Sequence, residues 1–315
     1  MQLQSIPAAG ERFLASFPLS REACHTVARE FASGEITPLA VQGANSYSVR
    51  VGEELVVQFR SKPVDLAVQE LALSIHGSKY IVPIVLQREQ PVYVYTSPYR
   101  GKTYCEQGIL SFPLDAQKKT LADLAAFFAQ SCYHTREVME ISLATLESYL
   151  KDCLTLPELG HKVQFLIDNL GMEIYSSTTD SVDKLAELPV VLIHDDLGSL
   201  NILADNDGNV TGILDWNGSQ YLPLGWNLYG VDEFLGYMRV DGWVDRKEKE
   251  ELEKVFWDAF WEKAPLPLCE RREKVQFAIT IAKGIGLLWR NVGPDGVDQM
   301  LKTYPGGLMY IKALL

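Results

Sequence analysis

Hydrophobic residues recur along the chain with two different periods, and the dominant period changes near residue 100. Residues 18–34 and 63–76 carry apolar side chains at intervals of three and four, which is the spacing of one helix face. Between them, residues 38–60 alternate apolar and polar positions around two glycine-containing turns, which predicts three short antiparallel strands. Two further strands are predicted at residues 80–87 and 92–97. The first hundred residues therefore predict a small sheet with one inserted helix.

Beyond Gly101 the helical period prevails over most of the chain. Helices are predicted at residues 120–134, 143–154, 162–171, 251–263 and 275–290. Residues 200–216 interrupt this series with two short apolar segments. The segments are joined by the sequence Asp-Asn-Asp-Gly-Asn at residues 205–209, and such turn chemistry predicts a hairpin.

This order of elements predicts an α+β fold of two lobes. Residues 1–34 are expected to form a helical extension, and residues 35–98 an N-lobe with a small antiparallel sheet and one inserted helix. Residues 99–315 are expected to form a larger, mostly helical C-lobe. With 315 residues, 47% of them hydrophobic, the chain is long enough to bury a large core.

The composition narrows the classes of function. The net charge is −12, from 29 basic and 41 acidic residues, and no basic stripe suggests a nucleic-acid partner. The plain interpretation of the acidic charge is solubility, and the alternative is a cationic ligand. No apolar run approaches the length of a membrane span, and the first residues do not resemble a signal peptide. The five cysteines are scattered and show no zinc spacing, so a reduced, cytoplasmic protein is expected.

Polar residues gather around the predicted hairpin. An apolar run ends immediately before His194, Asp195 and Asp196, and Asn201 follows five residues after Asp196. Asp215 ends the second strand, and because a hairpin returns to its start, we expect Asp215 beside Asn201 and Asp196 facing the same cleft. Carboxylate and amide oxygens suit a hard cation such as Mg²⁺. Phosphoryl transfer also needs a carboxylate that orients a hydroxyl and accepts its proton.

The stretch resembles the His-x-Asp-x4-Asn loop and the following metal-binding aspartate of the protein-kinase-like superfold. It looks most like the aminoglycoside phosphotransferase and choline kinase branch, in which an Asp-Trp pair, here Asp215-Trp216, commonly replaces Asp-Phe-Gly. The surrounding sequence is similar to that of fungal aminoglycoside-phosphotransferase-like proteins. The resemblance covers roughly residues 35 to 290 and implies a two-lobed fold with ATP between the lobes.

The resemblance implies a role for each residue of the motif. Asp196 would be the catalytic base, and His194 the histidine that braces its loop. Asn201 and Asp215 would be ligands of Mg²⁺. ATP and Mg²⁺ are therefore the expected cofactors.

The resemblance also assigns nucleotide-binding positions in the N-lobe. The turn with Gly43 and Asn45 lies where a loop covers the phosphates, although an ordinary turn would have the same sequence features. Ser97 and Tyr99 lie in the segment that resembles the hinge against adenine. Glu70 occupies the position of the glutamate that pairs with a strand lysine, and its alternative is a solvated helix position.

The sequence departs from the family pattern at the lysine itself. Gln58 stands where the family has the cation that holds the α- and β-phosphates. Arg60 lies two residues later and hence on the same face of the strand. The hypothesis is that Arg60, or a shifted register, supplies the cation and that Glu70 orients it.

Three further departures surround the motif. Asp195 stands between His194 and Asp196, where the family usually has a small or basic residue, and it is either solvated or a ligand of a cationic substrate or a metal. Asn217 and Trp226 replace acidic residues that are common in relatives.

The leading hypothesis is an enzyme, an ATP- and Mg²⁺-dependent phosphotransferase that acts on a hydroxyl of a small molecule. The acceptor would be an alcohol or amino-alcohol, such as a secondary metabolite, and Asp195, Asp232 and Glu233 are the candidates to contact a cationic one. The alternative is a degenerate kinase fold that binds a nucleotide or metabolite without phosphoryl transfer, or that serves another biosynthetic reaction. Gln58, Asp195 and Trp226 motivate that alternative. The acceptor, the choice of ATP or GTP, and the oligomeric state stay open.

Overall fold

The computed structural model describes residues 7–43, 45–108, 112–170, 184–293, 296–303 and 305–315. The chain forms two compact units, each built from two segments. The first unit contains Met1–Thr120 and Ser199–Asn217, and the second contains Leu121–Gly198 and Gly218–Leu315. Within the described part of the chain, no helix has both the length and the apolar character needed to cross a membrane.

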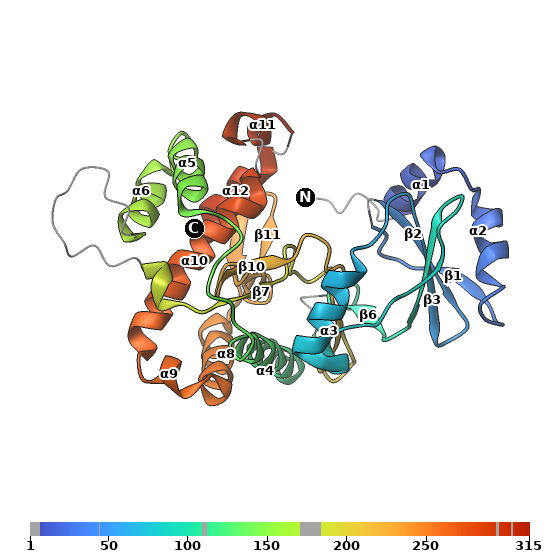
Figure 1. The fold of residues 1–315 in the computed structure, drawn as a ribbon, viewed down its shortest axis with the longest axis horizontal. Coiled ribbons are helices and arrows are strands. Elements are labelled where there is room, and N and C mark those ends of the chain that lie inside the picture. Colours follow the sequence, from blue (N-terminus) through green and yellow to red (C-terminus); the bar gives the residue numbers. More distant parts are fainter. Residues whose placement is uncertain (1–6, 44, 109–111, 171–183, 294–295, 304) are drawn as a thin grey trace. The chain divides into compact units, whose positions relative to one another are not determined.

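The first unit is organised around an antiparallel sheet in the order β1-β2-β3-β5-β4. The strands are β1 (Ile36–Pro38), β2 (Ser46–Val51), β3 (Leu55–Arg60), β4 (Val85–Arg88) and β5 (Tyr93–Pro98). Helices α1 (Pro7–Ser16) and α2 (Arg21–Ala28) lie against the sheet, as Figure 1 shows. Phe13, Phe17 and Cys24 from these helices pack on Tyr47, Val49 and Phe59 from the strands. One face of the sheet is thus a hydrophobic core, and alternate residues point to the other face.

The predicted three-strand segment is confirmed, but its first strand lies earlier than expected. β1 ends at Pro38, and the Gln42 side chain takes over the backbone hydrogen bonds that follow. Its Nε2 donates to Leu39 O at 2.7 Å and to Ser48 O at 2.9 Å, while its Oε1 accepts from Ser48 N at 2.8 Å. A side chain that satisfies the backbone in this way replaces ladder pairing and ends the strand.

The inserted helix α3 (Leu66–Tyr80) is confirmed and is longer than predicted. Asp65 caps its start, because the Asp65 carboxylate accepts from the backbone nitrogens of Ala67 and Val68. Gly77 has φ 69°, so the helix bends there instead of ending. A bridge between Ile81 and Ile213 links the end of α3 to the predicted hairpin.

The predicted hairpin is confirmed as β8 (Ile202–Ala204) and β9 (Val210–Ile213), and β6 (Lys102–Thr103) adds a third strand. The hairpin belongs to the first unit, whereas the sequence-based division at residue 98 places it in the C-lobe. At the turn, Gly208 approaches the beginning of α4 (Leu114–Ser131), and Thr120 Oγ1 donates to Gly208 O at 2.7 Å. These contacts attach the turn to the same unit as the sheet.

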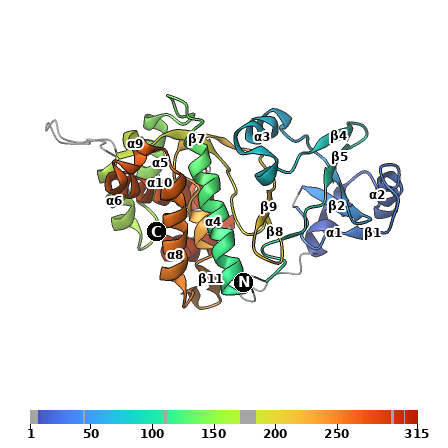
Figure 2. The ribbon, with the colours of Figure 1, turned by 90° about the horizontal axis from the view of Figure 1, so that it is seen from below.

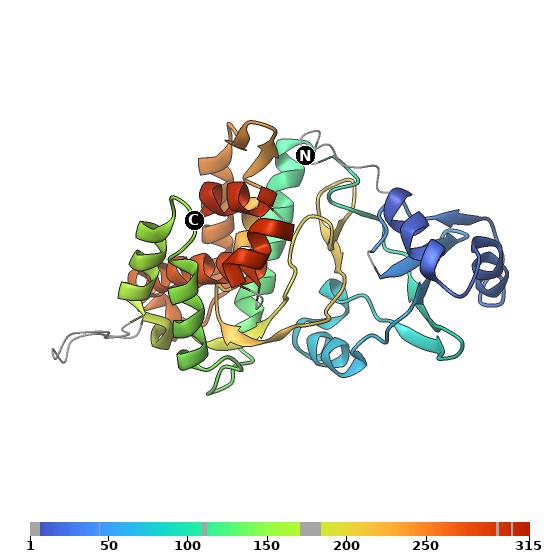
Figure 3. The same ribbon diagram turned by 90° about the horizontal axis from the view of Figure 1, so that it is seen from above.

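The second unit is mostly helical, as predicted. Around α10 (Arg272–Val292) lie α5 (Leu143–Cys153), α6 (Gly160–Asn169) and α12 (Pro305–Leu314), as Figures 1 and 3 show. The other helical segments are η1 (Lys184–Glu187), α7 (Tyr229–Asp232), α8 (Lys249–Lys263), α9 (Leu266–Cys269) and α11 (Gly296–Thr303). The last eleven residues of α4 lie beside α8 (Figure 2), where Phe128 meets Phe256 edge to face at 6.0 Å. The burial of α10 agrees with its apolar sequence.

Two two-stranded antiparallel sheets complete the second unit. β7 (Val190–Ile193) pairs antiparallel with β10 (Gln220–Pro223), and β11 (Gly236–Arg239) pairs with β12 (Gly242–Asp245). Neither of these sheets was predicted. Residues 193 and 220 are paired although 26 residues separate them, and hydrophobic period carries no information about such pairing.

Candidate active site

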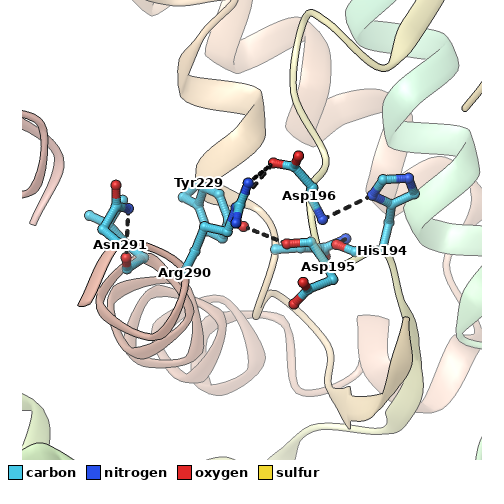
Figure 4. A network of polar contacts seen from close by, with 8 residues as sticks. His194, Asp195, Asp196, Tyr229, Arg290 and Asn291 are labelled. Atoms are coloured by element: carbon cyan, nitrogen blue, oxygen red, sulfur yellow. Dashed lines mark hydrogen bonds and ion pairs between the residues drawn. The ribbon is translucent and has the colours of Figure 1, made fainter. Parts of the chain in front are cut away.

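One group of candidate residues is the loop that follows β7 in the second unit. His194 is fully buried, and its Nδ1 accepts a hydrogen bond from Asp196 N at 3.1 Å (Figure 4). Asn227, which is also buried, donates from Nδ2 to His194 O at 3.2 Å. The histidine therefore lies inside the protein and holds the backbone of the loop, while the Asp196 side chain remains exposed.

Asp196 forms an ion pair with Arg290 of α10. Arg290 Nε lies 3.0 Å and Nη2 lies 2.6 Å from Asp196 Oδ1. The Asp196 carboxylate raises the pKa of Arg290, against the lowering effect of burial. The exposed carboxylate thus has a fixed cationic neighbour within the second unit.

Asp195 is half-buried, so its side chain is partly open to water. Its backbone carbonyl accepts a hydrogen bond from Tyr229 Oη at 3.1 Å. Burial raises the pKa of the Asp195 carboxyl, the Arg290 cation opposes this, and the Asp196 carboxylate adds to it. Asp195 and Asp196, although adjacent, therefore occupy different electrostatic environments.

A second group of candidate residues lies at the base of the β8–β9 hairpin in the first unit. Leu214 N donates to Asn201 O at 2.8 Å, which joins the two ends of the hairpin beside Asn201 and Asp215. Asp215 has φ 57°, a left-handed conformation that is uncommon for residues other than glycine and is a frequent feature of functional sites. Its Oδ1 accepts from Asn217 Nδ2 at 3.3 Å. The structure therefore brings the two predicted metal ligands to the same end of one hairpin.

Buried neighbours hold this end of the hairpin in place. Trp216 is 1% exposed, donates from Nε1 to Ile213 O at 3.2 Å, and packs on the His76 ring at 5.6 Å. Asn217 Oδ1 accepts from Asp65 N, the N-cap residue of α3, at 3.0 Å. Trp216 is thus an anchor that points into the core while Asp215 points to solvent.

The donor set at Asn201 and Asp215 fits Mg²⁺. Mg²⁺ in phosphotransferases takes one or two protein oxygen ligands and completes its coordination with phosphate and water. One amide oxygen and one carboxylate are of this kind. In the described ranges no group of three or more His, Cys, Asp or Glu side chains could hold a metal by itself, so this donor set needs phosphate and water to complete a site.

The predicted phosphate-binding residues lie on the sheet of the first unit. Gly43 and Asn45 are exposed in the turn before β2, and Ala44 between them lies outside the described residues. Ser97 and Tyr99 lie at the end of β5 and just after it. Tyr99 N donates to Glu54 O at 2.6 Å, and Arg50 lies over the Tyr99 ring at 5.1 Å.

Gln58 and Arg60 share the polar face of the sheet, as their spacing predicts. Arg60 Nη1 donates to Gln58 Oε1 at 3.4 Å, and Gln58 Nε2 lies 3.4 Å from Ser46 Oγ and 3.3 Å from Ser48 Oγ. Arg60 Nε is buried and has no hydrogen-bond partner among the described residues. Glu70 is exposed, and no ion pair joins it to Arg60 in the part of the chain that the structure describes, so the role of Glu70 in orienting Arg60 stays a prediction.

Asp232 and Glu233, two of the three acids predicted to meet a cationic acceptor, behave differently. Asp232 is 8% exposed, and the Lys283 ammonium lies 2.8 Å from its Oδ1. Burial raises the pKa of the Asp232 carboxyl, and the Lys283 cation opposes this. A carboxylate already paired inside the protein does not suit contact with an external amine. Glu233 is half-buried with its carboxylate close to Gly198, two residues after Asp196.

Sequence reasoning missed several residues that shape the site, among them Asn227, Tyr229 and Arg290. Each contacts the loop 194–196 from a segment at least 30 residues away. Their only local signal is their position in the chain. Asn227 and Tyr229 lie four and six residues after the end of β10, and Arg290 lies in the last turn of an amphipathic helix. Neither position distinguishes a functional residue from a structural one.

Comparison with known proteins places this arrangement in context. A family model described as the phosphotransferase enzyme family matches residues 35–231. No curated protein matches the chain significantly. A choline/ethanolamine kinase family protein from Mesorhizobium loti has 18% sequence identity and a TM-score of 0.54, with 98% of this chain and 94% of that chain covered.

A second solved structure is the ADP-bound aminoglycoside phosphotransferase APH(2'')-Ib. It has 14% identity and a TM-score of 0.50, with 94% of this chain and 98% of that chain covered. At these identities the likeness shows the fold, and it confirms the kinase-like α+β architecture. Because the family model matches more than half of the chain, including the motif from His194 to Asp215, the chain belongs to the phosphotransferase enzyme family.

Proposed function

We propose that this protein transfers the γ-phosphoryl group of a Mg²⁺-bound nucleoside triphosphate to a hydroxyl of a small molecule. The observation that carries the proposal is the loop 194–196, in which a buried histidine holds the backbone and an exposed carboxylate is left at the surface. Asp196 would orient the acceptor hydroxyl and accept its proton. The reaction itself then depends on positioning and on neutralised charge more than on covalent chemistry.

Asn201 and Asp215 would hold Mg²⁺ at the end of the β8–β9 hairpin. Bound there with the triphosphate, Mg²⁺ would neutralise charge that develops on the phosphate oxygens. The left-handed backbone of Asp215 and the buried Trp216 beside it support a fixed position for this ligand. A single carboxylate and a single amide leave the remaining coordination to phosphate and water.

For the nucleotide, Arg60 is the proposed cation in place of the family lysine. It lies beside Gln58 on the polar face of the sheet, and its Nε is buried without a partner among the described residues. A half-buried guanidinium whose Nε has no partner among the described residues favours an anionic ligand. The turn with Gly43 and Asn45 and the segment with Ser97 and Tyr99 would contact the rest of the nucleotide, which we propose to be ATP. One neighbour in fold was solved with ADP bound.

The acceptor is proposed to be an alcohol or amino-alcohol. Asp195, next to Asp196 in the chain, and Glu233, whose carboxylate lies close to Gly198, are both half-buried and would favour a cationic substituent on it. Neighbours in fold are an aminoglycoside phosphotransferase and a choline/ethanolamine kinase family protein, but a shared fold does not determine the substrate.

A second candidate is a nucleotide-binding protein without phosphoryl transfer. Gln58 favours it, because a neutral amide stands where the family has a cation. The ion pair of Asp196 with Arg290 also favours it, if the pair withholds the carboxylate from an acceptor.

The test is slow hydrolysis of Mg-ATP, with water as the acceptor, by wild type and by Asp196→Asn. A general base contributes about 10²- to 10⁴-fold, so Asp196→Asn should lower kcat by at least about 100-fold and leave nucleotide affinity unchanged. The control is Asp258→Asn, which removes an exposed carboxylate on α8 and should leave kcat as in wild type. Tight Mg-ATP binding with no turnover by wild type would instead support the second candidate.

A further inference from the structure

The contact between Arg290 and Asp196 has an unusual geometry. The guanidinium group commonly binds a carboxylate with two nitrogens on two oxygens. Here Nε at 3.0 Å and Nη2 at 2.6 Å both lie on the same oxygen, Oδ1 (Figure 4). Two nitrogens of one guanidinium on the same oxygen fix the position of Oδ1 relative to α10.

Arg290 is presented to the loop by a rigid part of the fold. It lies in the last turn of α10, and residues 284–288 of this helix are all buried. Its neighbour Trp289 packs on Tyr149 at 4.7 Å and on Trp226 at 6.1 Å. Tyr229 lies beside Arg290 in Figure 4 and donates to the Asp195 carbonyl. The base is thus contacted from two sides, by its own loop and by α10.

The ion pair could either withhold the Asp196 carboxylate from the acceptor or orient it, and the strength of the pair decides which. The side chains of Arg290 and Asp196 are 43% and 52% exposed, and ion pairs this open to water are weak. A weak pair cannot withhold the carboxylate from a bound acceptor. It is nevertheless sufficient to favour one rotamer of a short side chain over the others.

We infer that Arg290 is a positioning residue, which holds the Asp196 carboxylate by Oδ1 in one orientation towards the acceptor hydroxyl. The inference rests on the proposed function, because it concerns the orientation of the same base. Arg290 acts through Asp196 and does not itself take the proton. Its removal therefore lowers the rate of the chemical step and not the affinity for the nucleotide.

The experiment measures Mg-ATP hydrolysis by wild type, Arg290→Met, Arg290→Lys, Asp196→Asn and the double variant Arg290→Met/Asp196→Asn. Arg290→Met is expected to lower kcat about tenfold, a usual coupling for two groups in contact, with KM for ATP unchanged. Arg290→Lys should restore part of kcat, since an ammonium can still reach Oδ1. In the Asp196→Asn background, Arg290→Met should have no further effect.

Arg272→Met is the matched control. Arg272 lies at the other end of α10, is exposed, and stacks over Trp261 at 5.3 Å, so its loss should leave kcat unchanged. Thermal unfolding of each variant excludes a folding defect as the cause of a lost rate.

The outcomes separate this inference from the proposed function. If wild type turns over ATP, Asp196→Asn does not, and Arg290→Met equals or exceeds wild type, the positioning role is wrong while the base assignment stands. If Arg290→Met lowers kcat equally in both backgrounds, Arg290 does not act through Asp196 and the inference is also overturned. If Asp196→Asn turns over ATP like wild type, the proposed base and the role of Arg290 are both wrong.

Discussion

Three consecutive residues, His194, Asp195 and Asp196, show how sharply the environment changes along one loop. The histidine is fully buried, the first aspartate is half-buried, and the second is exposed. Neighbouring side chains on an extended backbone point in different directions, so adjacent acids need not share a function. Only Asp196 combines exposure with a direct cationic partner.

The buried environment of Asp195 predicts a dependence of stability on pH. Burial raises the pKa of its carboxyl in the folded protein, so the folded state holds this proton more strongly than the unfolded state. Asp195 therefore lowers stability as pH rises from the ordinary aspartate value through the raised folded value. Asp195→Asn should increase Tm at pH 7, and the gain should disappear towards pH 3.

Thermal unfolding of wild type and Asp195→Asn across this pH range checks the prediction. Asp207→Asn, in the exposed turn of the hairpin, is the control and should show no such pH-dependent gain. A Tm for Asp195→Asn that lies below wild type at pH 7 would mean that Asp195 makes a favourable interaction which outweighs its burial.

At the scale of elements, α10 is the support of the site, since it carries Arg290 and packs against Trp226. α10 approaches the Trp226 backbone closely because Gly286 has no side chain. A Cβ at Gly286 would lie 1.7 Å from Trp226 O, which is a backbone atom and cannot move without shifting the segment that leads to Asn227 and Tyr229.

Gly286→Ala should therefore destabilise the protein by about 1–3 kcal/mol, the usual cost of overpacking. Chemical denaturation measures the free energy of unfolding. Gly284→Ala is the matched control on the same helix, because its Cβ would meet the flexible end of Leu166 at 3.0 Å, and alanine favours the helix by about 1 kcal/mol. Equal losses for the two variants would show that the Trp226 contact is not what makes position 286 sensitive.

At the scale of the whole molecule, the candidate residues are divided between two compact units. Asn201 and Asp215 belong to the unit with the sheet and Arg60, while His194 and Asp196 belong to the helical unit. Metal and nucleotide binding can therefore be measured separately from the proton transfer assigned to Asp196.

Binding to the folded state raises stability by mass action, by about 2.7 kcal/mol at a ligand concentration 100 times Kd. Mg-ATP should therefore raise Tm of wild type by several degrees. Asp215→Asn should lose the part that depends on Mg²⁺, and Arg60→Met should lose most of the shift from ATP with or without Mg²⁺. Thermal shift with ATP, Mg²⁺ and EDTA distinguishes the two variants.

Asp196→Asn should keep the full Mg-ATP shift, because the base is assigned to the acceptor and not to the nucleotide. A full shift in Arg60→Met would show that another group replaces the family lysine. A full shift in Asp215→Asn would remove the metal assignment and leave the rest of the proposal standing.

Local sequence patterns were sufficient for much of the fold. The helices α3, α4, α5, α6, α8 and α10 and the β8–β9 hairpin agree with the predicted segments, because a helical period or a turn sequence is a property of neighbouring residues. The same holds for the spacing from His194 through Asn201 to Asp215, which indicated the family before any contact was known.

Long-range contacts decided the rest. The sequence by itself determined which residues could carry oxygen ligands, a base and the hairpin between them. Only the tertiary structure decided that Asp196 pairs with Arg290, 94 residues away, that Asp232 is neutralised by Lys283, and that Asp195 is drawn partly out of water. Charge and burial depend on which segments pack together, and that packing is set by the whole core and not by the period of any one segment.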